Sequence, residues 1–125
     1  MLLFVYGTLK RGGRNHPYLA KERFVGEACT VPGWAMYDVG GYPGLVAAPD
    51  SDRSVPGELW DVSDETLVRL DQLEGVDAGI FARVSIPLRN GPAAQAQAYH
   101  YILGIVGRRQ VDGPWPCSGA LPRRP

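Results

Sequence analysis

Residues 2–12 read LLFVYGTLKRG: a short apolar run ends at Gly7 and continues into a loop rich in glycine and basic residues. The run mixes aliphatic, β-branched and aromatic side chains, which predicts a buried first strand. Successive backbone N–H groups in a turn after a strand can form a concave anion site, although a plain structural turn fits the same residues. The phosphate-loop pattern GxxxxGK[ST] fails, because Gly13 and Arg14 stand where lysine and serine or threonine are needed.

The rest of the chain alternates strand-like runs with turns marked by Gly and Pro. Strands are expected at residues 23–31, 34–39, 44–48 and 55–62, a short helix from Asn15 toward Lys21, and a hairpin over 81–88 and 94–103 that turns at Asn90-Gly91. The many turn signals favour a sheet bent on itself. Residues beyond Gly104 show no periodicity. The element order predicts one α+β domain over residues 1–115 with a mixed or largely antiparallel sheet, and a loosely ordered tail at 116–125.

One helix is predicted between an N-cap at Ser63 and a terminating glycine at Gly75. At about 3.6 residues per turn, Glu74 lies on the same helix face as Leu67 and Leu70, which is the face expected to pack on the sheet. Burial and the negative end of the helix dipole would both raise the pKa of this carboxyl. Such a Glu can act as a general acid and base near neutral pH. A solvated Glu, or one paired with Arg83, is the alternative interpretation.

Composition argues against several classes of function. Lys plus Arg and Asp plus Glu number 13 each, and the basic residues are spread along the chain, so nucleic-acid binding is not expected. The first six residues are too short for a signal peptide, and no apolar stretch approaches about 18 residues, so we expect a cytoplasmic protein without a membrane span. Cys29 and Cys117 lie outside any CxxC or His-rich neighbourhood, which predicts reduced thiols and no metal site.

Several motifs occur in an order that carries more information than any one of them. Residues 4–12 are followed by Asn15-His16, and then by GYPGLV at 41–46, GELWDV at 57–62, LDQLEG at 70–75 and AYHY at 98–101. Together they resemble the gamma-glutamylcyclotransferase-like superfamily, and in detail its gamma-glutamylamine cyclotransferase branch. The resemblance covers the chain to about Trp115.

The resemblance implies a small, closed or nearly closed β-barrel flanked by short helices, with a pocket at the end of the first strand. It implies release of 5-oxoproline from a small gamma-glutamyl compound by intramolecular attack, without metal or cofactor, in a monomer or weak homodimer. The Glu of the LDxxEG motif falls on Glu74 as the catalytic residue. The implied substrate-binding residues are Tyr6, Gly7, Thr8, Leu9 and, on the late aromatic strand, Tyr101.

One departure from the family pattern concerns substrate choice. Phe81, two residues before Arg83, stands where the family often has Tyr, and the absent hydroxyl predicts altered leaving-group recognition or weaker activity. The opening loop differs from that of the glutathione-specific branch, which makes glutathione a less expected substrate. Besides an enzyme, the sequence permits a non-catalytic small-molecule-binding module of the same fold. A purely structural barrel would leave the ordered motifs unexplained.

Overall fold

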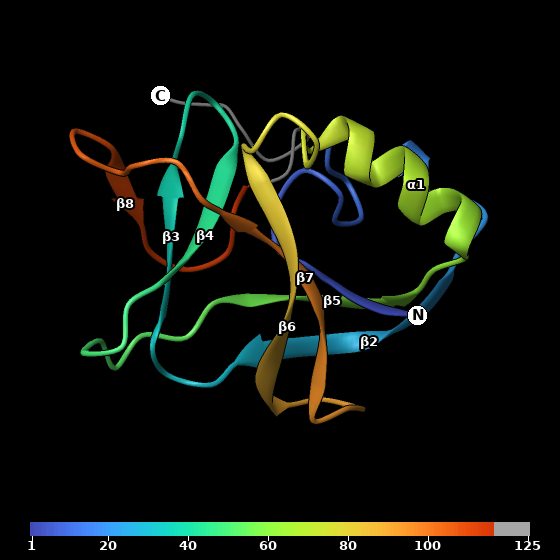
Figure 1. Cartoon of the computed structure of the whole chain (residues 1–125). Helices are drawn as coiled ribbons and strands as arrows, with labels where there is room; N and C mark the ends of the chain where they lie inside the picture. Colours follow the sequence, from blue (N-terminus) through green and yellow to red (C-terminus); the bar gives the residue numbers. More distant parts are fainter. Residues whose placement is uncertain (117–125) are drawn as a thin grey trace.

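The computed structural model describes residues 1–116, so that Cys117 and nearly all of the predicted tail at 116–125 lie outside the described residues. Within residues 1–116 the elements, labelled in Figure 1, are β1 (Leu2–Val5), the 3₁₀ helix η1 (His16–Leu19), β2 (Arg23–Thr30), β3 (Trp34–Asp38), β4 (Pro43–Ala47), β5 (Pro56–Asp61), α1 (Asp64–Leu73), β6 (Phe81–Asn90), β7 (Gln95–Tyr101) and β8 (Arg109–Val111).

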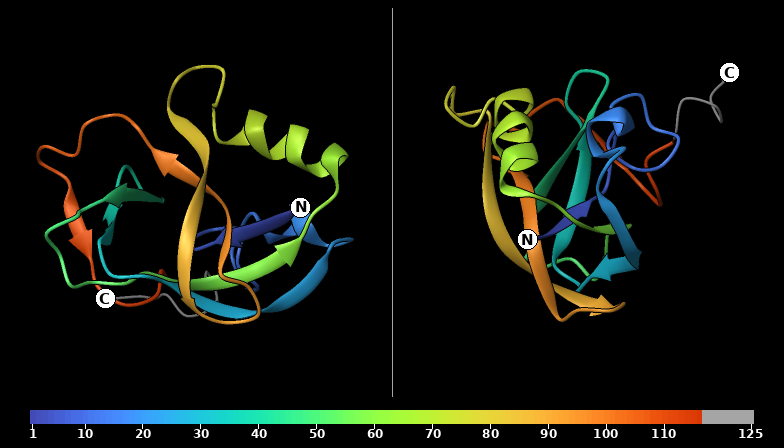
Figure 2. Two further views of the ribbon diagram at one scale, coloured as in Figure 1. Left: turned by 60° about the horizontal axis from the view of Figure 1, so that its bottom comes forward. Right: turned by 90° about the vertical axis from the view of Figure 1, so that its right-hand side faces the viewer.

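Five of the strands close into a barrel in the order β1-β5-β2-β6-β7. Neighbours in this series are antiparallel, and the barrel closes because β7 also pairs in parallel with β1, where Gln97 lies opposite Leu3. This arrangement confirms the predicted α+β fold with a small mixed barrel and short flanking helices. Figures 1 and 2 show α1 over one side of the barrel and β4, β3 and β8 on the other.

The barrel wall forks along β7, because its second half pairs with β4 instead of β1, with Leu45 opposite His100. Tyr6, the first residue after β1, fills this fork. Its hydroxyl donates to the Tyr99 carbonyl at 2.7 Å and accepts the Leu45 N–H at 3.2 Å. Burial raises the pKa of Tyr6 far above its usual range, so the phenol stays neutral and keeps its proton for this bond. Tyr6, whose hydroxyl makes both of these hydrogen bonds, therefore lies at the point where β1 and β4 separate along β7.

Helix α1 begins and ends where the sequence predicts. The Ser63 hydroxyl accepts the Thr66 N–H at 3.3 Å, and Gly75 follows the helix with a φ of +68°. Leu67 and Leu70 are buried in the core, as the helical spacing predicts. Replacing a fully buried leucine such as Leu70 by alanine typically costs about 2–5 kcal/mol, so the inner face of α1 is firmly fixed.

The segment after Gly104, for which the sequence predicts no structure, contains the short strand β8. β8 pairs antiparallel with β3, with Val111 opposite Met36. Three residues are too few for a period of two to emerge, and the pairing depends on a distant partner strand. Among the described residues, no helix is long and apolar enough to cross a membrane.

Candidate active site

A pocket opens at the end of β1, beside the fork in the barrel wall. Its narrow inner part has a volume of about 30 Å³ and is lined by residues 4–9, Tyr42, Pro43, Glu74 and Tyr99. A wider outer part of about 230 Å³ shares Thr8, Tyr42 and Glu74 with the inner part. The outer part is also lined by Arg14, Asn15, Leu73, Ile80 and Phe81. Glu74 therefore lies where the two parts of the pocket meet.

The loop after β1 keeps its shape through bonds to its own backbone and to Asn15. The Asn15 backbone N–H donates to the Thr8 carbonyl at 2.9 Å, and its side-chain amide donates to the Thr8 hydroxyl at 2.9 Å. Gly7 passes so close to Pro43 that a Cβ atom at position 7 would lie 2.2 Å from the proline Cγ. Only glycine allows this approach, which explains why the loop begins with glycine.

A buried carboxylate holds the far side of the same loop. Glu58 on β5 accepts the backbone N–H of Arg11 at 3.1 Å and the Arg11 Nε at 3.1 Å. Its Oε1 also accepts the indole N–H of Trp60 at 3.1 Å. These bonds satisfy a charge that would otherwise be costly to bury, and they join the loop to the barrel.

The backbone N–H groups of Gly7, Thr8 and Leu9 remain available to a ligand. Within residues 1–116 none of the three donates a hydrogen bond to another residue. Unbonded amides that line a partly buried pocket are costly unless water or a ligand accepts them. Three successive amides of this kind suit an anion or a developing oxyanion.

Glu74 is placed by the way α1 ends. The Gly75 N–H bonds to the Gln72 carbonyl and the Val76 N–H to the Asp71 carbonyl, which is the Schellman arrangement for a helix end. Glu74 stands at its C-cap, partly buried, and its carboxylate accepts no hydrogen bond and forms no ion pair with any residue of the described chain. Burial raises the pKa of Glu74 to about 7, as the sequence predicts.

The alternative in which Arg83 neutralises Glu74 is wrong, because Arg83 binds Asp71. The guanidinium of Arg83 makes two bonds, of 3.0 and 3.2 Å, to the carboxylate of Asp71. The Tyr99 hydroxyl donates to the same carboxylate at 2.7 Å. Burial alone would raise the pKa of Asp71, but these bonds outweigh it and hold that pKa below its usual value. The network ties α1 to β6 and β7 one turn before Glu74.

With this geometry in view, comparison with known proteins identifies the family. The family model "Gamma-glutamyl cyclotransferase, AIG2-like" matches residues 3–117. The chain belongs to this family. A Vibrio cholerae relative is 48% identical over 75 residues, which are 60% of this chain and 63% of the relative, less than two thirds of its length.

Two further family comparisons span more of both chains. The Gamma-glutamylaminecyclotransferase of Rattus norvegicus is 31% identical over 113 residues, covering 79% of this chain and 75% of the rat protein. The crystal structure of an AIG2-like protein from Mus musculus superposes with a TM-score of 0.68 at 26% identity, covering 82% of this chain and 76% of that chain. The predicted family resemblance is thereby confirmed.

The structure brings together most of the residues that the family motifs predict for the site. The predicted loop of Tyr6, Gly7, Thr8 and Leu9 and the predicted acid/base Glu74 line one pocket. Their roles in binding and catalysis stay predictions.

Tyr101 is not among the residues that line either part of the pocket. It is buried and packs edge-on against Phe81, with 5.3 Å between ring centroids. Tyr99, two residues earlier on the same face of β7, lines the inner pocket in its place. The period of two in a strand marks both tyrosines as inward-facing, and only the fork in the barrel wall decides which one reaches the pocket.

Phe81 lines the outer part of the pocket, and its expected effect on leaving-group recognition stays a prediction. Sequence reasoning missed Tyr42 and Pro43 as pocket residues, although the GYPGLV motif contains them. It also missed Arg14 at the outer pocket. Among residues 1–116, no group of three or more His, Cys, Asp or Glu side chains is arranged to hold a metal ion.

Proposed function

We propose that this protein is a cyclotransferase that releases 5-oxoproline from a gamma-glutamyl amine or a gamma-glutamyl amino acid, with Glu74 as general acid and base. One observation carries the proposal. Glu74 is an unpaired, partly buried carboxyl with a pKa of about 7, and it lines the same pocket as the unbonded amides of Gly7, Thr8 and Leu9. A proton carrier beside an anion-binding loop is the combination that an intramolecular acyl transfer needs.

The loop amides and the two parts of the pocket suggest how the substrate lies. The amides of Gly7, Thr8 and Leu9 hold the α-carboxylate of the gamma-glutamyl group or the oxyanion that forms on its γ-carbonyl. The inner part, at about 30 Å³, has room for little more than water-sized groups. The leaving group therefore extends into the outer part, past Glu74.

The reaction requires protons to move between two nitrogens of one molecule. The α-ammonium releases one proton to water to become a nucleophilic amine, and the amine nitrogen loses a second proton as it attacks the γ-carbonyl carbon. Glu74 takes this second proton and gives it to the departing nitrogen as the γ-amide C–N bond breaks. The freed amine takes its last proton from water. Because amine and carbonyl belong to one folded molecule, proximity supplies much of the rate.

Release of 5-oxoproline from gamma-glutamyl compounds tests the proposal. We expect turnover by the wild-type protein and a fall of at least ~10²–10⁴-fold in the Glu74→Gln variant, because the amide cannot carry the proton. Glu65→Gln is the matched control, since Glu65 is an exposed residue in the first turn of α1. Wild-type rates in Glu74→Gln would remove this residue from the mechanism. Tight binding without turnover by the wild type would identify a binding module instead.

A further inference from the structure

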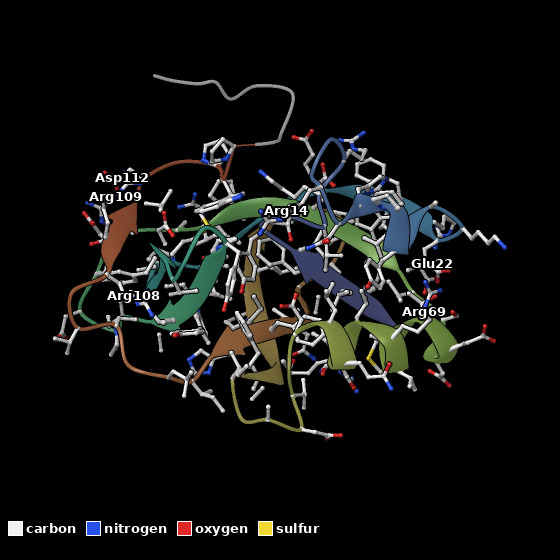
Figure 3. The ribbon with its side chains drawn as sticks, turned by 90° about the horizontal axis from the view of Figure 1, so that it is seen from above. Arg14, Glu22, Arg69, Arg108, Arg109 and Asp112 are labelled. Atoms are coloured by element: carbon white, nitrogen blue, oxygen red, sulfur yellow. The ribbon has the colours of Figure 1, made fainter. Side chains whose placement is uncertain are left out.

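Arg14 lies at the mouth of the pocket. It lines the outer part together with Glu74 and also lines an adjoining cavity of about 380 Å³ together with Arg109. Its backbone is held there because the next residue, Asn15, is bonded to Thr8 through both its main-chain and its side-chain N–H groups. Seen from above in Figure 3, Arg14 lies over the centre of the molecule, between α1 and the segment that carries Arg108 and Arg109.

No carboxylate neutralises Arg14 within residues 1–116. Two acidic residues line a cavity together with Arg14, Asp38 in the adjoining cavity and Glu74 in the outer part of the pocket. Asp38 accepts the N–H groups of Gly40 and Gly41 and pairs with Arg109 at 3.6 Å. Glu74, with a pKa of about 7, is substantially protonated at neutral pH. Arg14 is therefore an exposed and unpaired cation among the residues that line the outer part.

We propose that Arg14 selects the leaving group by binding its carboxylate, so that the preferred substrate is a gamma-glutamyl amino acid and a gamma-glutamyl compound with a cationic leaving group is disfavoured. This inference rests on the proposed function, since it places the leaving group in the outer pocket. In a gamma-glutamyl amino acid the carboxylate is attached to the carbon next to the departing nitrogen. A nitrogen beside Glu74 thus brings the anion to the part of the pocket that Arg14 lines.

The guanidinium fork matches a carboxylate in shape and charge and can bind it with two parallel bonds. The same charge repels a second ammonium group on a diamine leaving group, so attraction and repulsion act together on substrate choice. A different role for Arg14, binding of the α-carboxylate of the glutamyl group itself, would affect every gamma-glutamyl substrate equally. This difference makes the two roles separable by experiment.

The test compares kcat/KM for 5-oxoproline release from gamma-L-glutamyl-L-alanine, gamma-L-glutamyl-L-alaninamide and gamma-L-glutamyl-1,4-diaminobutane. The first two differ at one group of the leaving amine, a carboxylate against a neutral carboxamide of similar shape, and the third carries a cation. For the wild type we expect about a tenfold preference for the alanine compound over the alaninamide and the diamine as the poorest substrate. A preference of about tenfold is the low end for one charge-assisted hydrogen bond, as suits a side chain that is exposed in the free protein.

Arg14→Gln should make the kcat/KM values for the three substrates similar, and Arg14→Glu should make kcat/KM highest for the diamine compound. Arg108→Gln removes the same charge from a neighbouring segment and should keep the wild-type preference. Because Arg14 is exposed, the thermal midpoints of the Arg14 variants should stay close to that of the wild type. Unchanged midpoints would exclude misfolding as the cause of an altered substrate preference. A wild type without preference, or an equal loss for all three substrates in Arg14→Gln, overturns the inference and leaves the proposed function intact. If the wild type releases no 5-oxoproline from any gamma-glutamyl compound, both the inference about Arg14 and the proposed function are overturned.

Discussion

Replacing Glu74 by glutamine should stabilise the folded chain at pH 8 relative to the wild type, while the two proteins differ much less at pH 4. The carboxyl has a pKa of about 7 in the folded chain against an ordinary value of 4.5. Between these values the folded state keeps a proton that the unfolded state has released. Wild-type stability therefore falls as the pH rises through this window, and the full cost of burying the charge is present above pH 7.

The size of the effect follows from the same two values. A pKa of about 7 against 4.5 corresponds to roughly 3 kcal/mol, and water at the pocket mouth reduces this, so we expect about 2 kcal/mol. For a domain of this size that is a change on the order of 8 °C in the thermal midpoint. The buried glutamine amide adds a cost that does not vary between pH 4 and 8. The pH dependence of the difference is thus the quantity to measure.

Chemical denaturation of wild type, Glu74→Gln and the control Glu65→Gln at pH 4, 6 and 8 provides the measurement. Glu65 is exposed, so its replacement should give a difference that varies little over this range. If Glu74→Gln is less stable than the wild type, and the loss of stability is larger at pH 8 than at pH 4, the native carboxylate is stabilised by a partner. The account of an unpaired, desolvated Glu74 would then be refuted.

Two further variants probe how Glu74 is held. Asp71→Asn should lower the free energy of unfolding at pH 7 by roughly 1–3 kcal/mol, because Arg83 loses its partner at a site about one quarter exposed. Since the pKa of Asp71 is depressed, this loss should shrink as the pH falls below about 4. A pH series of thermal melts measures it, and Asp77→Asn, at an exposed residue, should show neither the loss nor its pH dependence. Gly75→Ala should lower the thermal midpoint and kcat together, because φ is +68° and the new Cβ would lie 2.9 Å from Ile80 Cδ1. Gly79→Ala has a similar φ of +74° and no atom within 4 Å, so a midpoint equal to that of Gly75→Ala would exclude the Ile80 contact as a cause.

Local patterns in the sequence were sufficient for the elements that surround the site. The apolar run before Gly7, the N-cap at Ser63 and the glycine at position 75 predict the end of β1 and both ends of α1, because each depends on neighbours only a few residues away. Closure of the barrel is different in kind. The pairing of Leu3 with Gln97 joins residues far apart in sequence, and a closed or nearly closed barrel is expected only from the family resemblance.

The same distinction explains what the sequence leaves open within the site. Whether Tyr99 or Tyr101 reaches the pocket depends on the position along β7 where β1 gives way to β4, and no local pattern encodes this position. The partner of Arg83 likewise depends on how α1 lies against β6. At the level of sequence, Asp71 and Glu74 are both acidic residues that Arg83 could reach, and only the packed structure shows that the guanidinium binds Asp71.

The pKa values of the two carboxyl groups at the end of α1 are shifted in opposite directions. Asp71 receives three hydrogen bonds from Arg83 and Tyr99, which keep its pKa low and use it to fix the helix. Those bonds also occupy the guanidinium that would otherwise ionise Glu74, three residues later. Because Arg83 is bound to Asp71, Glu74 stays unpaired, and burial alone raises the pKa of Glu74 to about 7. Environments that push two neighbouring carboxyl groups in opposite directions are a recurring way to assign acid and base roles. The ion pair that stabilises the helix end is thus also the reason that an unpaired carboxyl with a pKa near neutrality can exist beside it.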